Sequence, residues 1–361
     1  MIVRDERANL EACLESARDA VDEICVVDTG SKDGTAELAA ELGASVDSFR
    51  WQDNFAAARN ASLGLASGQW VLVLDADERI VEPRLARERL MDFASQSAGF
   101  GGQVVIESPL AGGEGSETSL SLTTRFFPRA PEWFFHGRIH EQVLCDGRAP
   151  KRRSTGVRVE HLGYLDEVIA SKDKLARNER LLITSLQQDG PDSYVAYHLG
   201  QTLALGGRHA EALEAFELAV EYCPDDAAYL AHLFEMGATS LRSLGHSRQA
   251  LEFLGNIEGD YVGRADTCFL LALLAMDTGE FERARSGFEH CLTLKGTLPE
   301  GGPSSPAASS WAAATNLGVL AEVLGDLGSA RRHYEHGLAL RPGDEPCLAG
   351  LARLEGLDPA R

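Results

Sequence analysis

The sequence is poor in basic residues and lacks any Cys-x-x-Cys pair. Its 34 lysines and arginines stand against 55 aspartates and glutamates, which gives a formal net charge of −21. An acidic surface repels nucleic acid and anionic membranes, so neither is expected as a partner. The seven cysteines are odd in number and scattered among apolar neighbours. This pattern favours reduced, packed thiols over a disulfide framework.

The sequence also lacks a long hydrophobic run and a recognisable secretory leader. The longest apolar stretch, residues 269–276, is far shorter than a bilayer-spanning helix requires. We therefore expect a cytoplasmic protein with no transmembrane segment. The same absence argues against a processive polysaccharide synthase that carries its own membrane channel.

The most informative feature that is present is an apolar run, residues 70–74, that stops at Asp75-Ala76-Asp77-Glu78. A short apolar run rich in β-branched residues predicts a strand buried on both faces of a parallel sheet. The acids then lie at the strand's carboxyl end, where open α/β sheets bind ligands. Because Asp75 and Asp77 project from one face, they repel each other unless a cation lies between them. Such oxygen ligands suit Mg²⁺ or Mn²⁺.

Two earlier strands are predicted to end in the same way. Residues 1–3 lead into a polar segment that contains Glu6, and residues 23–27 end at Asp28. Each is followed by a predicted helix, over residues 9–20 and 36–43 respectively. Glu6 and Asp28 are therefore expected along the same sheet edge as the acids at positions 75 and 77.

Seven short segments together carry a family resemblance. They are residues 1–6, 26–35, 58–60, 74–78, 125–127, 137–142 and 161–164. In this order they resemble the family 2 glycosyltransferases of GT-A fold, and more narrowly a bacterial branch with tetratricopeptide repeats behind the transferase. The resemblance implies an α/β, Rossmann-like domain with a mostly parallel sheet. Since such relatives begin several residues earlier in the first strand, either the true start lies upstream of Met1 or the edge of the nucleotide pocket is trimmed.

The resemblance also implies roles for individual residues. The acid at position 28 corresponds to the one that recognises the nucleotide base, and Asp77 corresponds to the ligand of the metal that bridges the diphosphate. By position, the nucleotide-sugar contacts would be Glu6, Asp28, Arg59, Asp75, Arg138 and His140, and the metal ligands would be Asp77, Asp75 and His161. Glu78 is expected to hold the loop rather than to contact the metal.

Glu141 is the predicted catalytic base. A carboxylate within reach of the acceptor hydroxyl or thiol would remove its proton as the sugar transfers, which predicts single displacement with inversion. The metal would neutralise charge on the leaving phosphate. His140 is expected to point away from Glu141 if the segment is extended, and would then orient a loop or touch phosphate.

Simpler explanations exist for several of these residues. Asp28 could cap a helix, and Arg59 could lie on a solvated helix face. Glu141 could pair with Arg138 three residues earlier, and His161 could be a structural hydrogen-bonder.

The central part of the sequence indicates an acceptor site without identifying it. Residues 103–108 are predicted to form a strand, and the glycine-rich residues 112–115 a mobile loop. An aromatic cluster follows, consisting of Phe126, Phe127, Trp133, Phe134 and Phe135. These rings could stack on sugars or form a core under the sheet.

The pattern becomes helical from about residue 168, and repeats of tetratricopeptide type follow. We predict a transferase domain over residues 1–167, a helical linker over 168–192, repeats over 193–345, and a capping helix and tail over 346–361. The repeats are predicted to start near Ser193, Ala231, Ala265 and Trp311. The resulting all-α solenoid offers a surface for a peptide or protein, or mediates a homodimer.

Three functions follow from these observations. The first is a metal-dependent inverting glycosyltransferase that moves a sugar from a nucleotide-sugar donor, expected to be a uridine diphosphate sugar, to a peptide or protein. The related branch includes peptide cysteine S-glycosyltransferases that modify bacteriocin precursors. The second is a transferase acting on a lipid-linked or surface glycan. The third is an inactive repeat-based interaction protein, against which the intact set of acids argues.

Overall fold

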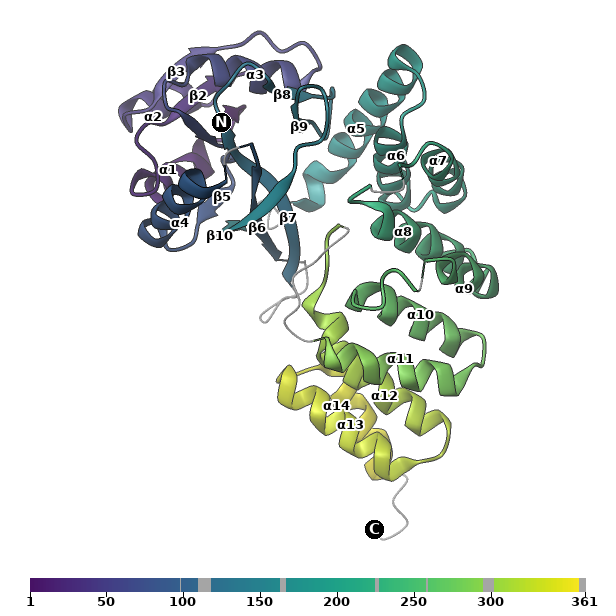
Figure 1. The fold of residues 1–361 in the computed structure, drawn as a ribbon. Helices are drawn as coiled ribbons and strands as arrows, with labels where there is room; N and C mark the ends of the chain where they lie inside the picture. The colour runs from purple at the N-terminus through teal and green to yellow at the C-terminus, as the bar shows by residue number, and fades with distance from the viewer. Residues whose placement is uncertain are drawn as a thin grey trace. The chain divides into compact units, whose positions relative to one another are not determined.

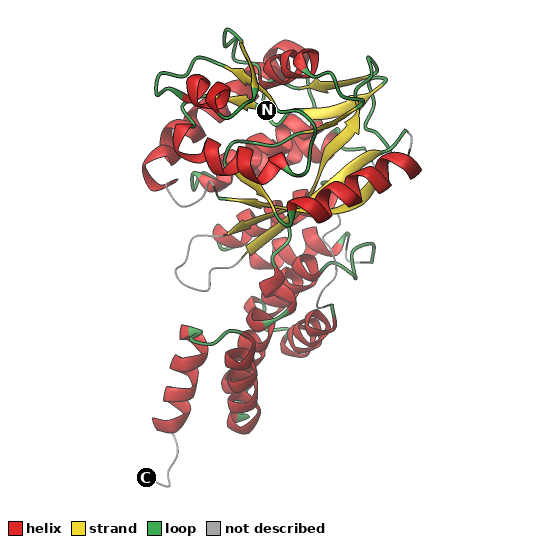
Figure 2. Ribbon diagram, turned by 90° about the vertical axis from the view of Figure 1, so that its left-hand side faces the viewer, coloured by secondary structure: helices red, strands yellow, loops and turns green. Residues whose placement is uncertain are grey.

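The computed structural model describes residues 1–97, 99–109, 118–162, 167–224, 227–257, 259–294 and 302–356, without the side chains of residues 109 and 167–173. The predicted loop at 112–115 lies outside this part of the chain. Two compact units are present, the first made of Met1–Ala111 and Ser121–Gly190, the second of Gly112–Leu120 and Pro191–Arg361. The named strands all precede residue 162, and the later named elements are helical (Figures 1 and 2).

The first unit opens with a three-stranded parallel sheet. Its elements are β1 (Ile2–Val3), α1 (Arg7–Arg18), β2 (Cys25–Asp28), α2 (Thr35–Glu41) and β3 (Ser45–Ser48). The strand order is β1-β2-β3, with parallel pairing throughout. Leu10 and Leu14 project from one face of α1 and are buried in a core with Val26. The predicted strand–helix alternation over the first 43 residues is therefore confirmed.

A five-stranded mixed sheet follows, in the order β4-β7-β6-β10-β5. Its elements and those around it are α3 (Phe55–Leu65), β4 (Trp70–Leu72), β5 (Glu78–Ile80), α4 (Pro83–Gln96), β6 (Gly101–Pro109), β7 (Thr118–Pro128), the hairpin β8 (Trp133–His136) and β9 (Gln142–Cys145), and β10 (Arg152–His161). β6 and β10 run parallel, whereas β5 runs antiparallel to β10. The predicted strand at 103–108 is confirmed as β6.

The predicted parallel pairing of the strand at 70–74 is wrong. β4 pairs antiparallel with β7, with Trp70 opposite Pro128 and Leu72 opposite Phe126, and it lies at an edge of its sheet. An apolar run indicates that a strand is buried. It does not indicate whether the neighbouring strand, which lies about fifty residues later in the sequence, runs parallel or antiparallel to it. The acids nevertheless follow closely after this strand, since Asp75 comes three residues after Leu72.

The helix α5 (Glu167–Asp189) belongs to the first unit, although the sequence suggested a linker there. Arg180 pairs with both carboxylate oxygens of Asp53, at 3.0 and 3.1 Å. The guanidinium of Arg177 lies 5.5 Å from the ring centroid of Phe55. Both partners lie where α3 begins, so these contacts attach α5 to the first unit.

The second unit is built from helix pairs. They are α6 (Ser193–Leu205) with α7 (His209–Glu221), α8 (Leu230–Ser243) with α9 (Ser247–Gly255), α10 (Ala265–Asp277) with α11 (Phe281–Thr293), and α12 (Trp311–Val323) with α13 (Leu327–Leu340). A short 3₁₀ helix, η1 (Pro306–Ser309), precedes α12, and α14 (Glu345–Gly356) follows α13. The predicted repeat starts lie within one residue of the starts of α6, α8, α10 and α12.

Small residues let the two helices of a pair approach closely. A Cβ atom on Gly200 of α6 would lie 2.4 Å from the Phe216 ring of α7. The same arrangement recurs in the last pair, where Gly318 faces Tyr334. Tyr334 is fully buried, and Leu354 of α14 belongs to the same core. The final helix therefore covers the apolar end of the repeat array.

Candidate functional site

Asp75 lies between two arginines. The Arg59 guanidinium from α3 bonds one carboxylate oxygen, and Nη2 of Arg125 from β7 donates to the other at 3.0 Å. Burial acts to raise the pKa of Asp75, but the two guanidinium groups outweigh it and hold the pKa far below its usual range. Asp75 is therefore a charge-neutralised carboxylate, a poorer metal ligand than the sequence suggested.

Glu78 holds the loop that carries the acids. Its Oε2 accepts a hydrogen bond from the Asp75 backbone N–H at 2.9 Å, and its Oε1 accepts one from Arg125 Nη2 at 2.9 Å. The residue is 2 % exposed, and burial raises the pKa of its carboxyl. The prediction that Glu78 holds the loop is confirmed.

Asp77 faces His161 instead of Asp75. His161 Nε2 lies 3.0 Å from Asp77 Oδ2, and His161 Nδ1 lies 3.3 Å from the hydroxyl of Ser108. The bond to Asp77 raises the pKa of His161. The Asp77 and His161 side chains are 25 % and 27 % exposed, so a solute can reach both. An accessible carboxylate beside an imidazole suits a divalent cation, although the described residues contain no group of three metal-ligating side chains.

Arg59 links the acids to Glu141. Its Nε donates to Glu141 Oε1 at 3.0 Å while its Nη2 is paired with Asp75. Glu141 therefore pairs with Arg59 and not with Arg138, and Arg59 is buried at 5 % exposure instead of lying on a solvated face. Within the described part of the chain, Nη1 of Arg59 is buried without a hydrogen-bond partner. A buried guanidinium N–H in this state is suited to an oxygen atom of a bound ligand.

Arg125 is the residue of this network that sequence reasoning missed. It lies in β7 directly before Phe126 and Phe127, and its side chain is only 16 % exposed. An arginine directly before two phenylalanines in a strand was the available signal, because a guanidinium buried beside such rings requires carboxylate partners.

The segment that carries Glu141 is a bend, so the argument that His140 points away along an extended strand fails. Gly137 has φ +103° and His140 has φ +52°, both in the left-handed region. Burial, followed by the charge of Arg177, lowers the pKa of His140 to about 4. Arg138 donates to the side chain of Gln188 in α5 at 2.6 Å. The side chain of Arg138 is thereby held against α5.

Glu6 and Asp28 differ in their relation to these acids. Burial, together with the charges of Asp77 and Asp75, raises the pKa of Glu6, which places Glu6 in the same electrostatic environment. Asp28 instead accepts hydrogen bonds from the backbone N–H groups of Gly30 and Ser31, at 3.2 and 3.1 Å, and so caps its own turn.

The aromatic cluster belongs to the core. Phe127 is fully buried and stacks on Trp133, with ring centroids 5.8 Å apart, while Phe126 stacks on Trp70 at 4.9 Å. Phe135 is also buried in the cluster that contains Phe127. Of the two explanations left open by the sequence, packing under the sheet holds for these four rings, and sugar stacking does not.

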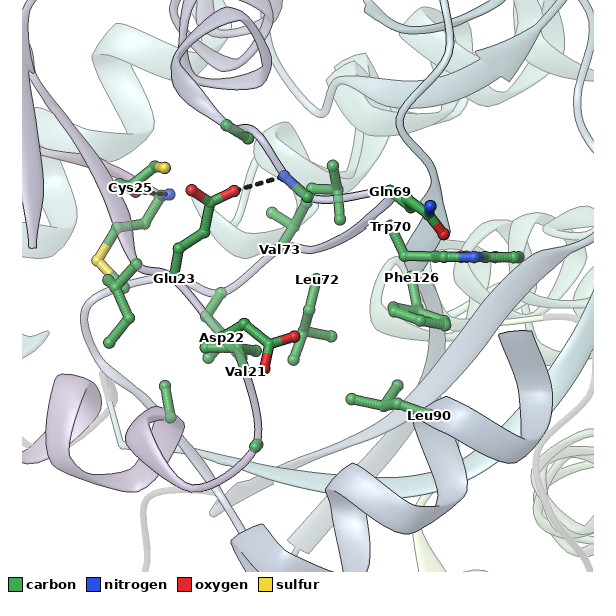
Figure 3. Close-up of a pocket in the computed structure, with 18 of the residues that line it drawn as sticks. Val21, Asp22, Glu23, Cys25, Gln69, Trp70, Leu72, Val73, Leu90 and Phe126 are labelled. Carbon is green, nitrogen blue, oxygen red and sulfur yellow. Dashed lines mark hydrogen bonds between the residues drawn. The ribbon is translucent and has the colours of Figure 1, made fainter. Parts of the chain in front are cut away.

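An apolar cavity of about 400 Å³ lies away from this network. Cys25, Trp70, Leu72, Leu90 and Phe126 are among the side chains that surround it (Figure 3). It lies at the start of β2, the central strand of the first sheet, and along β4, an edge strand of the second, and neither Asp75 nor Asp77 lines it. The cavity is therefore not the predicted nucleotide-sugar site.

Comparisons with known proteins agree with this architecture. Residues 1–110 match the model of the family described as Glycosyl transferase family 2, and residues 194–226 and 265–297 match that of the tetratricopeptide repeat. A TPR repeat-containing protein of Synechococcus elongatus is 34 % identical over 57 % of this chain and 52 % of its own length. The glycosyltransferase SunS of Bacillus phage SPbeta is 25 % identical over 59 % of this chain and 50 % of its own.

The chain thus spans about half the length of the curated relatives it matches. Among solved structures, the TPR protein YrrB is 18 % identical over 51 % of this chain and 87 % of its own, with a TM-score of 0.41. No helix within the described ranges is both long and apolar enough to traverse a bilayer. The N-terminal part of the chain, residues 1–110, is thus similar to family 2 glycosyltransferases, and the later part is similar to tetratricopeptide repeats.

Proposed function

We propose that this protein is a metal-dependent, inverting glycosyltransferase that moves a sugar from a nucleotide-sugar donor, a uridine diphosphate sugar, to a peptide or protein. The observation that carries the proposal is the network around Arg59, in which one buried guanidinium joins Asp75 to Glu141. Its remaining buried N–H supports an anionic or hydroxyl-bearing ligand at this point.

Asp77 and His161 are the residues that would hold the divalent cation, because they are accessible and not neutralised by arginine. When bound, the cation supplies charge neutralisation for the diphosphate leaving group. Asp75 is instead assigned to the sugar or ribose hydroxyls, for which a carboxylate fixed between Arg59 and Arg125 is a rigid acceptor.

Glu141 is assigned as the base. It removes the proton of the acceptor hydroxyl or thiol while the acceptor atom bonds the anomeric carbon and the bond from that carbon to the diphosphate oxygen breaks. Arg59 fixes the orientation of Glu141 through the 3.0 Å bond to Oε1, and leaves Oε2 to take the proton. Because the base acts in one displacement step, the anomeric configuration inverts.

The test begins with binding. Uridine diphosphate is titrated into the protein with and without Mn²⁺, and the same titrations are run on Asp77→Ala and on the exposed-site control Glu132→Ala. Metal-dependent binding should be lost only in Asp77→Ala. If the unaltered protein shows no metal-dependent binding of any nucleoside diphosphate, the transferase proposal fails and the interaction-protein alternative gains support.

Turnover is then measured with a panel of nucleotide sugars and peptide acceptors. Glu141→Gln is expected to lower kcat by a factor of about 10² to 10⁴ while donor affinity is kept, because the base is lost and the shape is retained. Unchanged turnover in Glu141→Gln would refute the base assignment. Retention of the anomeric configuration in the product would refute single displacement.

A further inference from the structure

Residues 302–305, here called the strap, lie against the first helices of two repeats. Gly302 contacts His232 of α8 so closely that an added Cβ would lie 2.6 Å from the His232 Cβ. Ser304 and Ser305 contact Asp266 of α10. The strap leads directly into η1, whose Ala307 and Ala308 are buried. A segment without helix or strand therefore lies across the helices that tetratricopeptide arrays commonly use for binding.

Arg264 holds the first two residues of the strap by their backbone. Its Nη1 donates to the Gly302 carbonyl at 3.3 Å, and its Nη2 donates to the Pro303 carbonyl at 2.5 Å. Arg264 is 6 % exposed, and Glu235 of α8 fixes its guanidinium with two bonds of 2.8 and 3.0 Å. The guanidinium is thus rigidly oriented towards two consecutive main-chain carbonyls, so these two hydrogen bonds do not depend on which side chains the two residues carry.

Asp266 holds the next two residues. One carboxylate oxygen accepts from the Ser304 hydroxyl, and the other accepts from the Ser305 backbone N–H at 2.9 Å. Burial raises the pKa of Asp266, and both bonds act in the opposite direction. The pattern of contacts selects one hydroxyl side chain followed by one free backbone N–H.

A third contact is a single antiparallel β-bridge. The Leu120 N–H donates to the Ser304 carbonyl and the Ser304 N–H donates to the Leu120 carbonyl, each at 2.8 Å. Leu120 belongs to the same compact unit as the strap. Main-chain pairing of this kind, with a few side-chain contacts for selection, is how an extended peptide binds by strand addition.

We propose that Arg264, Asp266 and Leu120 form a binding site for an extended polypeptide, and that the strap is its intramolecular occupant. The contacts of the site define the partner as a peptide in which two residues bound through their main-chain carbonyls are followed by a serine or threonine. A tethered occupant competes at an effective concentration in the millimolar range, so an external peptide binds well only when the strap is displaced. This binding site is independent of the catalytic proposal, since its readout is peptide binding and not transfer.

The first experiment weakens the strap and leaves the site intact. Gly302→Val places a β-branched side chain at φ +122° and against His232, so the strap should leave while Arg264 and Asp266 are unaltered. A fluorescent peptide with the sequence of residues 302–308 should bind this variant at least about tenfold more tightly than the parent, because the competitor is gone. Gly255→Val is the control and should bind as the parent does, because a Cβ added at this helical glycine would meet no atom of another part of the protein within 4 Å.

Selectivity is tested in the same background. A peptide with alanine in place of Ser304, and the double variant Gly302→Val with Asp266→Ala, should both lose most of the binding. Equal binding of the parent and Gly302→Val, or binding that ignores the serine and Asp266, would overturn the proposal. Absence of binding to a Gly302→Val protein with unchanged circular dichroism would do the same.

If Gly302→Val does not fold, the proposal is tested on the parent protein. Amide hydrogen exchange at Leu120 and Ser304 is followed while the peptide is raised to millimolar concentration. Displacement of the strap predicts faster exchange at Ser304, whose N–H donates to Leu120, as peptide is added. Exchange that does not respond to the peptide means that the strap is a permanent part of the fold and that no such site exists.

Discussion

Arg125 is the residue whose loss should most disturb the candidate site. Its Nη2 serves the buried Glu78 and the Asp75 carboxylate at once. Arg125→Met is expected to cost about 3–5 kcal/mol of stability, because two carboxylates are left without their shared cation. Thermal and urea unfolding of the first unit would measure it. Arg84→Met is the control, since the Arg84 side chain is 89 % exposed and its pair with Asp19 should contribute below about 1 kcal/mol.

A rescue variant identifies the cause. In the Arg125→Met background, Glu78→Gln removes one unpaired buried charge and should restore part of the lost stability. If Glu78→Gln instead lowers stability further, loss of packing and not unpaired charge explains the effect of Arg125→Met.

His232 should make the second unit sensitive to acid. Burial, and then the charge of Arg264, lower the pKa of His232 from 6.5 to about 4. Facing groups include the Tyr197 hydroxyl at 2.6 Å, Arg264 and Asp266. In the unfolded chain His232 takes up a proton below pH 6.5, whereas in the folded chain it does so only near pH 4. The contribution of neutral His232 to the stability of the folded state is therefore present above pH 6.5 and is lost as pH falls towards 4.

The expected loss between pH 7 and pH 5 is about 2 kcal/mol, which follows from 1.36 kcal/mol per pKa unit. Melting temperatures of the parent and His232→Gln at the two pH values would measure it, and the variant should lose less. His336→Gln, at an exposed position in α13, is the control. Equal acid sensitivity in the parent and His232→Gln would contradict this explanation.

At the scale of elements, close helix packing depends on glycines that face large rings. Gly318→Ala would place a Cβ 2.6 Å from the ring of Tyr334, which is buried and tethered by its hydroxyl to Glu322 at 2.7 Å. We expect a loss of about 1–3 kcal/mol, because the tethered ring cannot move aside. Gly328→Ala in the same helix pair is the control, since its Cβ would meet nothing closer than 3.7 Å and should be neutral or slightly stabilising. Equal melting temperatures for the two variants would show that the Tyr334 ring moves aside without a loss of stability.

The elements also show which patterns are reliable in the sequence. Helical periodicity and small residues located the start of each repeat to within one residue, because each helix buries a face against its neighbour in sequence. The direction of the strand at 70–72 was not recoverable, because its partner β7 is supplied by a distant segment. The bend at Gly137 and His140 was likewise missed, since a non-glycine residue at φ +52° gives no clear signal.

At the scale of the whole molecule, the two compact units should give separable unfolding transitions. Each has its own buried core, one centred on residues such as Val104 and Val157 and the other on residues such as Leu274 and Phe288. In calorimetry, Arg125→Met should lower one transition and Gly318→Ala the other. A single transition shifted equally by both variants would show that the units unfold together.

The sequence alone determined the order of the strand ends, the acidic loop and the repeat array, because these follow from local periodicity and from polar residues that interrupt apolar runs. It also placed Glu78 correctly as a residue that holds the loop. Only the tertiary structure decided which charges neutralise which acids. Arg59 and Arg125 reach Asp75 from 16 and 50 residues away, so that the acid expected to bind a cation is paired with two guanidinium groups of the chain itself. Pairing between distant residues depends on how sheets and helices pack, and no local pattern encodes it.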